Sequence, residues 1–152
     1  MESILKNKVI ITVAPTGPLS PKAHNSNVPV TPEEIADDVY RCWMAGAAIA
    51  HLHMRDEHDK GTMDPELFKK TVKLIQERCN IIINLTSSGD PYASDDERLP
   101  HIAQIQPEMA TFDAGSFNWV PVNVFMNSPE FLEKLAITMN EAKVKPEFEI
   151  FH

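Results

Sequence analysis

Residues 31–55 read TPEEIADDVYRCWMAGAAIAHLHMR and combine the start of a helix with the strand that follows it. Thr31 is a typical N-cap residue, and the proline and two acids after it favour the first turn of a helix. Apolar side chains then recur at helical spacing until Gly46, a residue typical of helix ends. The run at 47–55 is apolar up to its histidines and predicts a strand that the protein buries.

The same alternation of strand and helix extends over the chain. Strands are predicted at 8–15, 47–55, 81–85, 109–113 and 146–151, and residues 122–127 are expected to be extended. Helices are predicted to begin near Thr31, Asp64, Ser94 and Ser128, the third of them broken near Pro100. A strand–helix order repeated four times predicts a parallel sheet with crossover helices. No linker divides the chain, and the long loop 16–30 is of a kind that often carries function.

The composition excludes several classes of protein. The chain has 152 residues, 43% of them hydrophobic, with 22 acids, 14 bases and a net charge of −8. This is a globular composition without a basic patch for nucleic acid, and no apolar run reaches the ~20 residues of a membrane helix. The N-terminal apolar stretch predicts a strand rather than a signal peptide, and the two cysteines form no C-x-x-C motif. A cytoplasmic protein is expected.

The strand at 47–55 ends in two histidines, His51 and His53. Residues two apart on a strand point to the same side, so both imidazoles could reach one ion at the usual Zn–N distance of ~2.0–2.1 Å. The alternative is a hydrogen-bonded histidine pair at a sheet edge. Two ligands do not complete a catalytic zinc site, which takes three from the protein. The other histidines are expected to be solvated or structural: His24, His58, His101 and His152.

Arg55 follows the histidine pair by two residues and is expected on the same face. Its guanidinium could hold an anionic substrate through paired N–H donors. The alternative is a salt bridge with an acid of the loop that follows, which contains Asp56, Glu57 and Asp59.

Polar residues also follow the next three strands, where ligand sites lie in parallel α/β folds. The strand at 81–85 leads into a polar turn, whose amides and hydroxyls suit a carboxylate or carbonyl oxygen. The later strands present Thr111 with Asp113, and Glu147 with Glu149, each pair two residues apart. Acids inside a buried strand are costly unless they are paired or used. The residues of the turn are Thr86, Ser87, Ser88 and Gly89.

Four segments together resemble the β-keto acid cleavage enzyme family: the block around GAAIAHLHMRDE, the turn NLTSSGD, the string PEMATFDAGSFNW and the final KPEFEIF. The resemblance runs along essentially the whole chain. It implies a (β/α)8 barrel of the TIM type that binds a divalent metal, normally zinc. It also implies that a β-keto acid is condensed with acetyl-CoA, giving acetoacetate and a new CoA thioester.

The family resemblance also assigns roles to residues. His51 and His53 correspond to metal-binding histidines, and Glu149, rather than Glu147, is our choice for the glutamate of the fifth strand. Glu149 and Arg55 are therefore the expected catalytic residues. The expected substrate-binding residues are Thr86, Ser87, Ser88, Gly89 and Thr111.

The chain departs from the family pattern in two places. Leu19 stands where the amino-keto-acid enzymes carry an acid that faces the substrate amine, so a different and less polar keto acid is expected. The third metal ligand and the catalytic Arg and Asp of the family belong to the later half of the barrel, which lies beyond this sequence. Residues 1–152 are therefore expected to be the N-terminal part of one barrel, with about five strands and four helices, while a full barrel takes ~250 residues.

An incomplete barrel exposes its sheet edges. We therefore expect a chain that is poorly stable as a lone monomer, or that closes its barrel as a homo-oligomer. Two other functions stay open. The first is another metal-dependent hydrolase or lyase on the same barrel, although such hydrolases place H-x-H on their first strand. The second is an inactive fragment that only binds metal.

Overall fold

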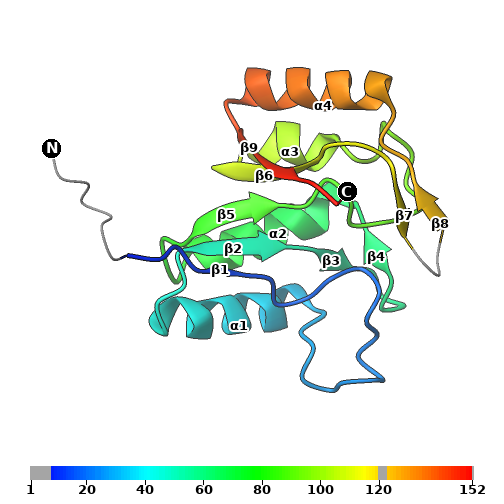
Figure 1. Ribbon diagram of the computed structural model, residues 1–152. Coiled ribbons are helices and arrows are strands. Elements are labelled where there is room, and N and C mark those ends of the chain that lie inside the picture. Colours follow the sequence, from blue (N-terminus) through cyan, green and yellow to red (C-terminus); the bar gives the residue numbers. More distant parts are fainter. Residues whose placement is uncertain (1–7, 120–122, 152) are drawn as a thin grey trace, which may run out of the picture.

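The computed structural model describes residues 8–119 and 123–151 (Figure 1). Its centre is a parallel sheet of five strands in the order β1-β2-β5-β6-β9. Every strand of this sheet lies beside the strand that precedes it in the chain, as the alternating pattern predicts. The strands are β1 (Thr12–Val13), β2 (Ile49–Leu52), β5 (Ile82–Leu85), β6 (Met109–Asp113) and β9 (Lys145–Glu149).

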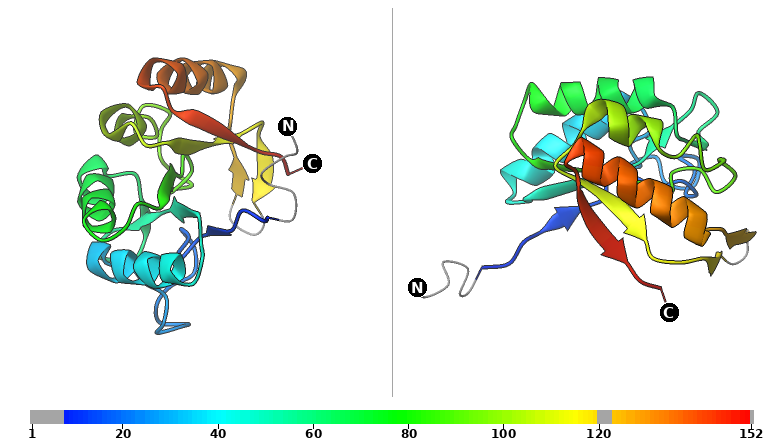
Figure 2. Two further views of the ribbon diagram at one scale, coloured as in Figure 1. Left: turned by 90° about the vertical axis from the view of Figure 1, so that its left-hand side faces the viewer. Right: turned by 90° about the horizontal axis from the view of Figure 1, so that it is seen from above.

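Four helices connect these strands and follow one another in an arc over one face of the sheet (Figure 2). They are α1 (Pro32–Met44), α2 (Pro65–Gln76), α3 (Pro100–Ile105) and α4 (Pro129–Ala142). Helices confined to one side of a parallel sheet with sequential strand order are the arrangement of a (β/α)8 barrel. The prediction of a partial barrel with five strands and four helices is confirmed for this chain.

The helix starts follow the predicted caps. Thr31 caps α1 in a capping box with Glu34, and Asp64 and Ser128 cap α2 and α4 through their side chains. Each of these three helices has proline in its first turn, where the missing N–H removes no helical hydrogen bond. The third helix is shorter than the predicted 94–106, because it begins only at Pro100. Pro100 occupies the first position of α3, where its missing N–H removes no helical hydrogen bond.

The prediction of a buried strand at 8–15 is wrong. Only Thr12–Val13 pairs as a strand, and Val9, Ile10 and Ile11 are 85%, 63% and 50% exposed. The strand β1 lies at the edge of the sheet and pairs with β2 alone, so one of its sides has no neighbour among the described residues. The apolar composition predicted the strand correctly, but burial depends on neighbours that composition does not specify.

Two antiparallel hairpins follow strands of the sheet and were not predicted as hairpins. The expected strand 47–55 divides after Leu52, and β3 (Met54–Arg55) pairs with β4 (Gly61–Thr62). The second hairpin pairs β7 (Phe117–Trp119) with β8 (Asn123–Phe125), which agrees with the expected extended segment. Both hairpins lie at the carboxyl end of the sheet (Figure 1).

The core lies between the sheet and the helices in two clusters. One joins α1 and α2 to β2 and β5 through side chains such as Ile35, Phe68 and Leu85, which are fully buried. The other joins α3 and α4 to β6 through Ile102, Phe131 and others. Of the helices in the described ranges, none is both long and apolar enough to cross a membrane.

Candidate metal and substrate site

The carboxyl ends of the central strands border a cavity of about 350 Å³. This is the end at which parallel α/β folds place their ligand sites. Its floor comes from strand ends and the turn after β5, and its rim from the hairpin β7–β8 and the chain after β9. The lining residues are Pro18, His51, His53, Thr86, Ser88, Asp113, Phe117, Trp119, Glu149 and Phe151.

His51 and His53 point to the same place, as their spacing predicts. Their Nε2 atoms are 3.0 Å apart, and their rings meet edge to face. Two nitrogens on one tetrahedral zinc ion, each at ~2.0–2.1 Å from it, lie about 3.3 Å apart, so little movement is needed to bind an ion. The same separation also fits the alternative of a hydrogen bond between the rings.

Burial keeps both imidazoles neutral. It lowers the pKa of His51, and burial together with His51 lowers the pKa of His53 to about 3. A neutral imidazole offers the lone pair that a metal requires. The Nδ1 atoms of both rings are buried without a hydrogen-bond partner among the described residues.

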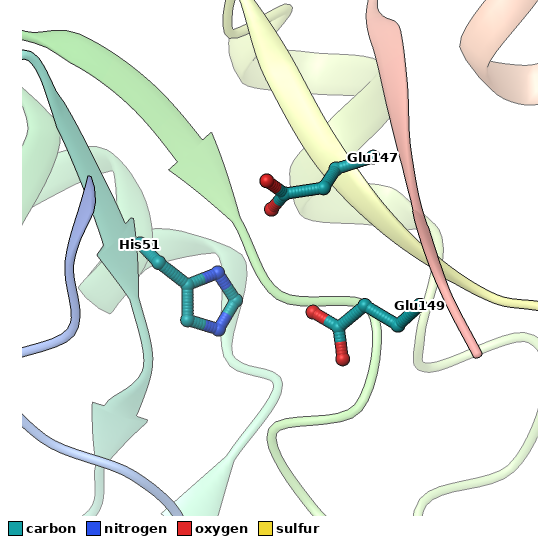
Figure 3. Close-up of side chains that lie close together, drawn as sticks. All are labelled: His51, Glu147 and Glu149. Atoms are coloured by element: carbon teal, nitrogen blue, oxygen red, sulfur yellow. The ribbon is translucent and has the colours of Figure 1, made fainter. Parts of the chain in front are cut away.

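Two carboxylates of β9 converge on His51. One ligand atom from each of His51, Glu147 and Glu149 lies within 4.8 Å of the others (Figure 3). In a flat sheet β2 and β9 are three strand spacings apart, roughly 14 Å. The curvature of the sheet therefore brings these side chains together. This chain thus contains a group of side chains that could hold a metal ion. The predicted ligand His51 belongs to this group, and the Nε2 atom of the other predicted ligand, His53, lies 3.0 Å from that of His51.

The group also contains Glu147, which the two acids at alternate positions of the predicted strand indicate as readily as Glu149. Asn84 on β5 donates a hydrogen bond to Glu147. Asp113, two residues after Thr111, is a further residue of the site that the expected set lacks. It is buried on β6 directly opposite Glu149.

Burial, with Asp113 and Glu147 nearby, raises the pKa of Glu149 to about 7. Burial also raises the pKa of Asp113. Like charges this close do not both ionise freely, so the two carboxyl groups hold a proton between them near neutral pH. A group that keeps or releases a proton at this pH suits acid–base chemistry.

The turn after β5 presents side chains, not amides, to the cavity. Thr86 and Ser88 line it, whereas Ser87 and Gly89 do not. The Ser87 amide donates to Thr111 Oγ1 at 3.0 Å, and the Ser88 amide donates to Thr86 Oγ1 at 3.0 Å. The hydroxyls of Thr86 and Ser88 are therefore the donors that this turn offers to a ligand.

Arg55 does not line the cavity. Its guanidinium donates to the backbone of Ser20 and Asp59, both at 2.8 Å, and forms an ion pair with the Asp59 carboxylate. These contacts are those of the salt-bridge alternative, and the catalytic role of Arg55 stays a prediction. Leu19 is 43% exposed and adjoins Pro18, which contributes to the cavity wall.

An aromatic rim, formed by Phe117, Trp119 and Phe151, covers one side of the cavity and was not predicted. Phe117 stacks on Phe151 with ring centroids 4.0 Å apart, and its ring is tilted against that of Trp119, with the centroids 6.0 Å apart. The aromatic residues around FDAGSFNW were a signal for such a surface. The site thus has a polar floor and an apolar wall.

Comparison with solved structures supports this architecture. The apo structure of ObcA superposes with a TM-score of 0.75, at 24% identity, over 82% of this chain and 30% of that one. At this identity the likeness shows the fold.

Comparison with curated proteins points to one family. The 3-keto-5-aminohexanoate cleavage enzyme of Fusobacterium nucleatum is 38% identical over 148 residues, which cover 97% of this chain and 54% of that protein. The 3,5-dioxohexanoate:acetyl-CoA acetone transferase of Paraburkholderia graminis is 42% identical over 115 residues, covering 75% and 37%. The chain thus spans about half the length, or less, of these relatives. Residues 8–152 match the family model described as beta-keto acid cleavage enzyme, and this chain therefore belongs to that family.

Proposed function

We propose that this chain provides the keto-acid-binding half of a metal-dependent β-keto acid cleavage enzyme, as the N-terminal part of one barrel domain. The proposed reaction joins the C1–C2 unit of a β-keto acid to the acetyl group of acetyl-CoA. The C2–C3 bond of the keto acid and the thioester bond of acetyl-CoA break. A C–C bond forms acetoacetate, and the remaining acyl group takes the CoA thiolate. The observation that carries this proposal is the convergence of His51, Glu147 and Glu149 beside His53.

The proposed metal is zinc or another divalent ion, held by His51 and His53, with the β9 carboxylates beside them. The buried neutral imidazoles, whose Nε2 atoms lie 3.0 Å apart, fit such an ion. When bound, a divalent ion polarises carbonyl and carboxylate oxygens as a Lewis acid. Of the family relatives, the Paraburkholderia protein carries acetyl-CoA in its name, which supports the choice of co-substrate.

The remaining roles fall to side chains around the cavity. Thr86 and Ser88 would donate hydrogen bonds to the substrate oxygens, while Thr111, Ser87 and Gly89 shape the turn that carries them. Glu149 would hold or accept a proton, with Asp113 as its partner. Arg55 could reach a substrate anion only after its bonds to the loops around it break.

The proposed substrate is a β-keto acid with an apolar substituent. Leu19 cannot pair with an ammonium group, and the aromatic rim offers apolar surface at the side of the cavity away from the strand floor. A charged substituent would lose its hydration against these rings without an ionic partner on the rim. We further propose that the protein is cytoplasmic and acts as a homo-oligomer.

The test is acetoacetate formation by the complete barrel that contains this chain, purified and loaded with zinc. β-Keto acids with alkyl, aromatic, amino and carboxylate substituents are supplied with and without acetyl-CoA. Formation that requires acetyl-CoA and favours the alkyl or aromatic acids supports the proposal. Turnover without acetyl-CoA indicates the hydrolase or lyase alternative. Retention of zinc with no turnover of any keto acid indicates the metal-binding fragment and overturns the proposal.

A further inference from the structure

Two buried side chains hold the turn 86–89 from the side opposite the cavity. We propose that Arg98 and His101 are positioning residues, which fix two successive carbonyls of this turn and thereby aim the hydroxyls of Thr86 and Ser88 into the cavity. The effect on substrate rests on the proposed function. The positioning itself does not, and it is tested separately below.

Arg98 is 2% exposed, although it carries a charge. Its Nε donates to the Ser87 carbonyl at 2.7 Å, and its two terminal nitrogens donate to the Met126 carbonyl and to Asn127 Oδ1. No ion pair is formed by Arg98 with the acids of the described ranges. Its guanidinium instead lies over the ring of Phe131, at 3.8 Å from the ring centroid. Burying a guanidinium is costly unless its donors are satisfied. The role of Arg98 is therefore to donate these hydrogen bonds rather than to pair with an acid.

His101 is fully buried, and its Nε2 lies 2.8 Å from the Thr86 carbonyl. A carbonyl only accepts, so Nε2 must carry the hydrogen. Its ring stacks on Phe68 with the centroids 4.3 Å apart, which fixes the direction of that N–H. Burial lowers the pKa of His101 to about 4, so the ring is neutral at neutral pH.

The two donors act on one short stretch of backbone. Arg98 lies two residues before α3 and His101 in its first turn, and their donors reach the adjacent carbonyls of Ser87 and Thr86. Behind the turn they occupy the carbonyls of residues 86 and 87. In front, the amides of residues 87 and 88 donate to hydroxyls. With both sides of these peptides held, the side chains of Thr86 and Ser88 have little freedom to turn away from the cavity.

Arg98 also links this turn to the rim. Asn127, which accepts from Arg98, donates from its side chain to the Gly115 carbonyl and from its backbone to Ser116 Oγ. These residues precede Phe117. One guanidinium therefore ties the polar floor of the cavity to the loop that carries its aromatic wall.

The first experiment measures amide hydrogen exchange in the purified protein. Arg98→Met removes the donors but keeps most of the side-chain bulk, and we expect exchange at Ser87 and Ser88 to become at least ~10-fold faster than in the wild type. Ile102→Ala is the matched control, because Ile102 is fully buried on α3, packs in the cluster of Phe131 and has no polar group to donate to the turn. Ile102→Ala should speed amide exchange throughout the protein, with no maximum at Ser87 and Ser88. Equal acceleration in the two variants would overturn the proposal.

His101 offers a conservative rescue. A glutamine amide nitrogen can replace Nε2 as the donor, so His101→Gln should keep slow exchange at Ser87, whereas His101→Leu should not. If Arg98→Met does not fold, Arg98→Lys, which keeps one donor, is compared with the same control. Identical exchange in His101→Gln and His101→Leu would contradict the role given to the His101 hydrogen bond.

The second experiment is a double-mutant cycle on keto-acid turnover. If Arg98 acts by aiming the Ser88 hydroxyl, Ser88→Ala should reduce kcat/KM by at least ~10-fold in the wild type and hardly at all in Arg98→Met. If Arg98 is merely structural, the effects of Arg98→Met and Ser88→Ala on kcat/KM multiply. That result would refute the link to substrate. A wild-type protein without any turnover would refute the proposed function, while the exchange result would still decide the positioning.

Discussion

Gly61 lies where the hairpin β3–β4 meets the turn after β5. A Cβ placed on it would overlap the Gly89 carbonyl oxygen and lie 2.8 Å from Pro18 Cβ. Backbone cannot move aside as a flexible side chain can, so Gly61→Ala should destabilise the protein by about 1–3 kcal/mol, as overpacking does. Urea denaturation measures this. Gly17→Ala is the control, because nothing lies within 4 Å of its Cβ, and a similar loss there would contradict the steric explanation.

His51 and His53 make a second prediction at this scale. Replacing either by alanine removes a proposed ligand, and the affinity for Zn²⁺ should fall by about 100-fold or more, beyond the 10–100-fold cost of losing an outer partner. Zinc content after dialysis against a competing chelator measures this. His58→Ala provides the control, since its side chain is 71% exposed in a charged loop. Unchanged zinc in the two cavity variants would show that these histidines do not bind the ion.

The residues of the site could be predicted only where the signal is local. The alternation of a strand places His51 and His53 side by side, and the structure has their Nε2 atoms 3.0 Å apart. The approach of Glu147 to His51 depends on the curvature of four strands, which no spacing in the sequence encodes. Asp113 lies beside Glu149 because of the β6–β9 register, another long-range property.

At the scale of elements, the start of α1 contains a titratable contact. Glu34 closes the capping box with Thr31, and Lys22 from the long loop pairs with it. The Lys22 hydrogen bond and the amides of Val30 and Thr31 lower the pKa of Glu34 from 4.5 to about 2. The stabilisation is therefore complete above pH 4.5 and is lost as the pH falls towards 2.

We expect Glu34→Gln to lower the free energy of unfolding at neutral pH by roughly 0.5 kcal/mol, because the carboxylate is 41% exposed and water screens the pair. The difference in free energy of unfolding between the variant and the wild type should shrink as the pH falls from 4.5 to about 2. At the lower pH the side chain at position 34 is uncharged in both proteins. Thermal unfolding over this pH range measures it. A difference between Glu34→Gln and the wild type that stays constant over this pH range would contradict the assignment.

Elements were predictable where a local device defines them. Thr31, Asp64 and Ser128 each precede proline, and all three helices begin at that proline. The hairpin β3–β4 was missed because the apolar run continues through Met54 after β2 has ended. Met54 and Arg55 form a separate strand because they pair with β4, further along the chain. A strand propensity taken from neighbouring residues does not detect such pairing.

At the scale of the whole molecule, the sheet has two unpaired edges in the described ranges. The outer strand β1 pairs only with β2, and β9 pairs only with β6. Apolar side chains lie exposed at both, including Val9 at 85%, Phe148 at 63% and Ile150 at 78%. Unpaired strands with exposed apolar side chains are templates for association.

We therefore expect the polypeptide 1–152 on its own to self-associate, increasingly so at higher salt, which screens the repulsion from its net charge of −8. Light scattering during size-exclusion chromatography, over a range of protein and salt concentrations, measures this. Lysines at Val9, three residues before β1, and at Phe148 on β9 should restore the monomer, because charge at a sheet edge blocks pairing. Ile137→Lys is the control, since Ile137 is 51% exposed on α4, away from both edges. If all three proteins remain monomeric at every salt concentration, the edges do not drive association, and the expected homo-oligomer would need another surface.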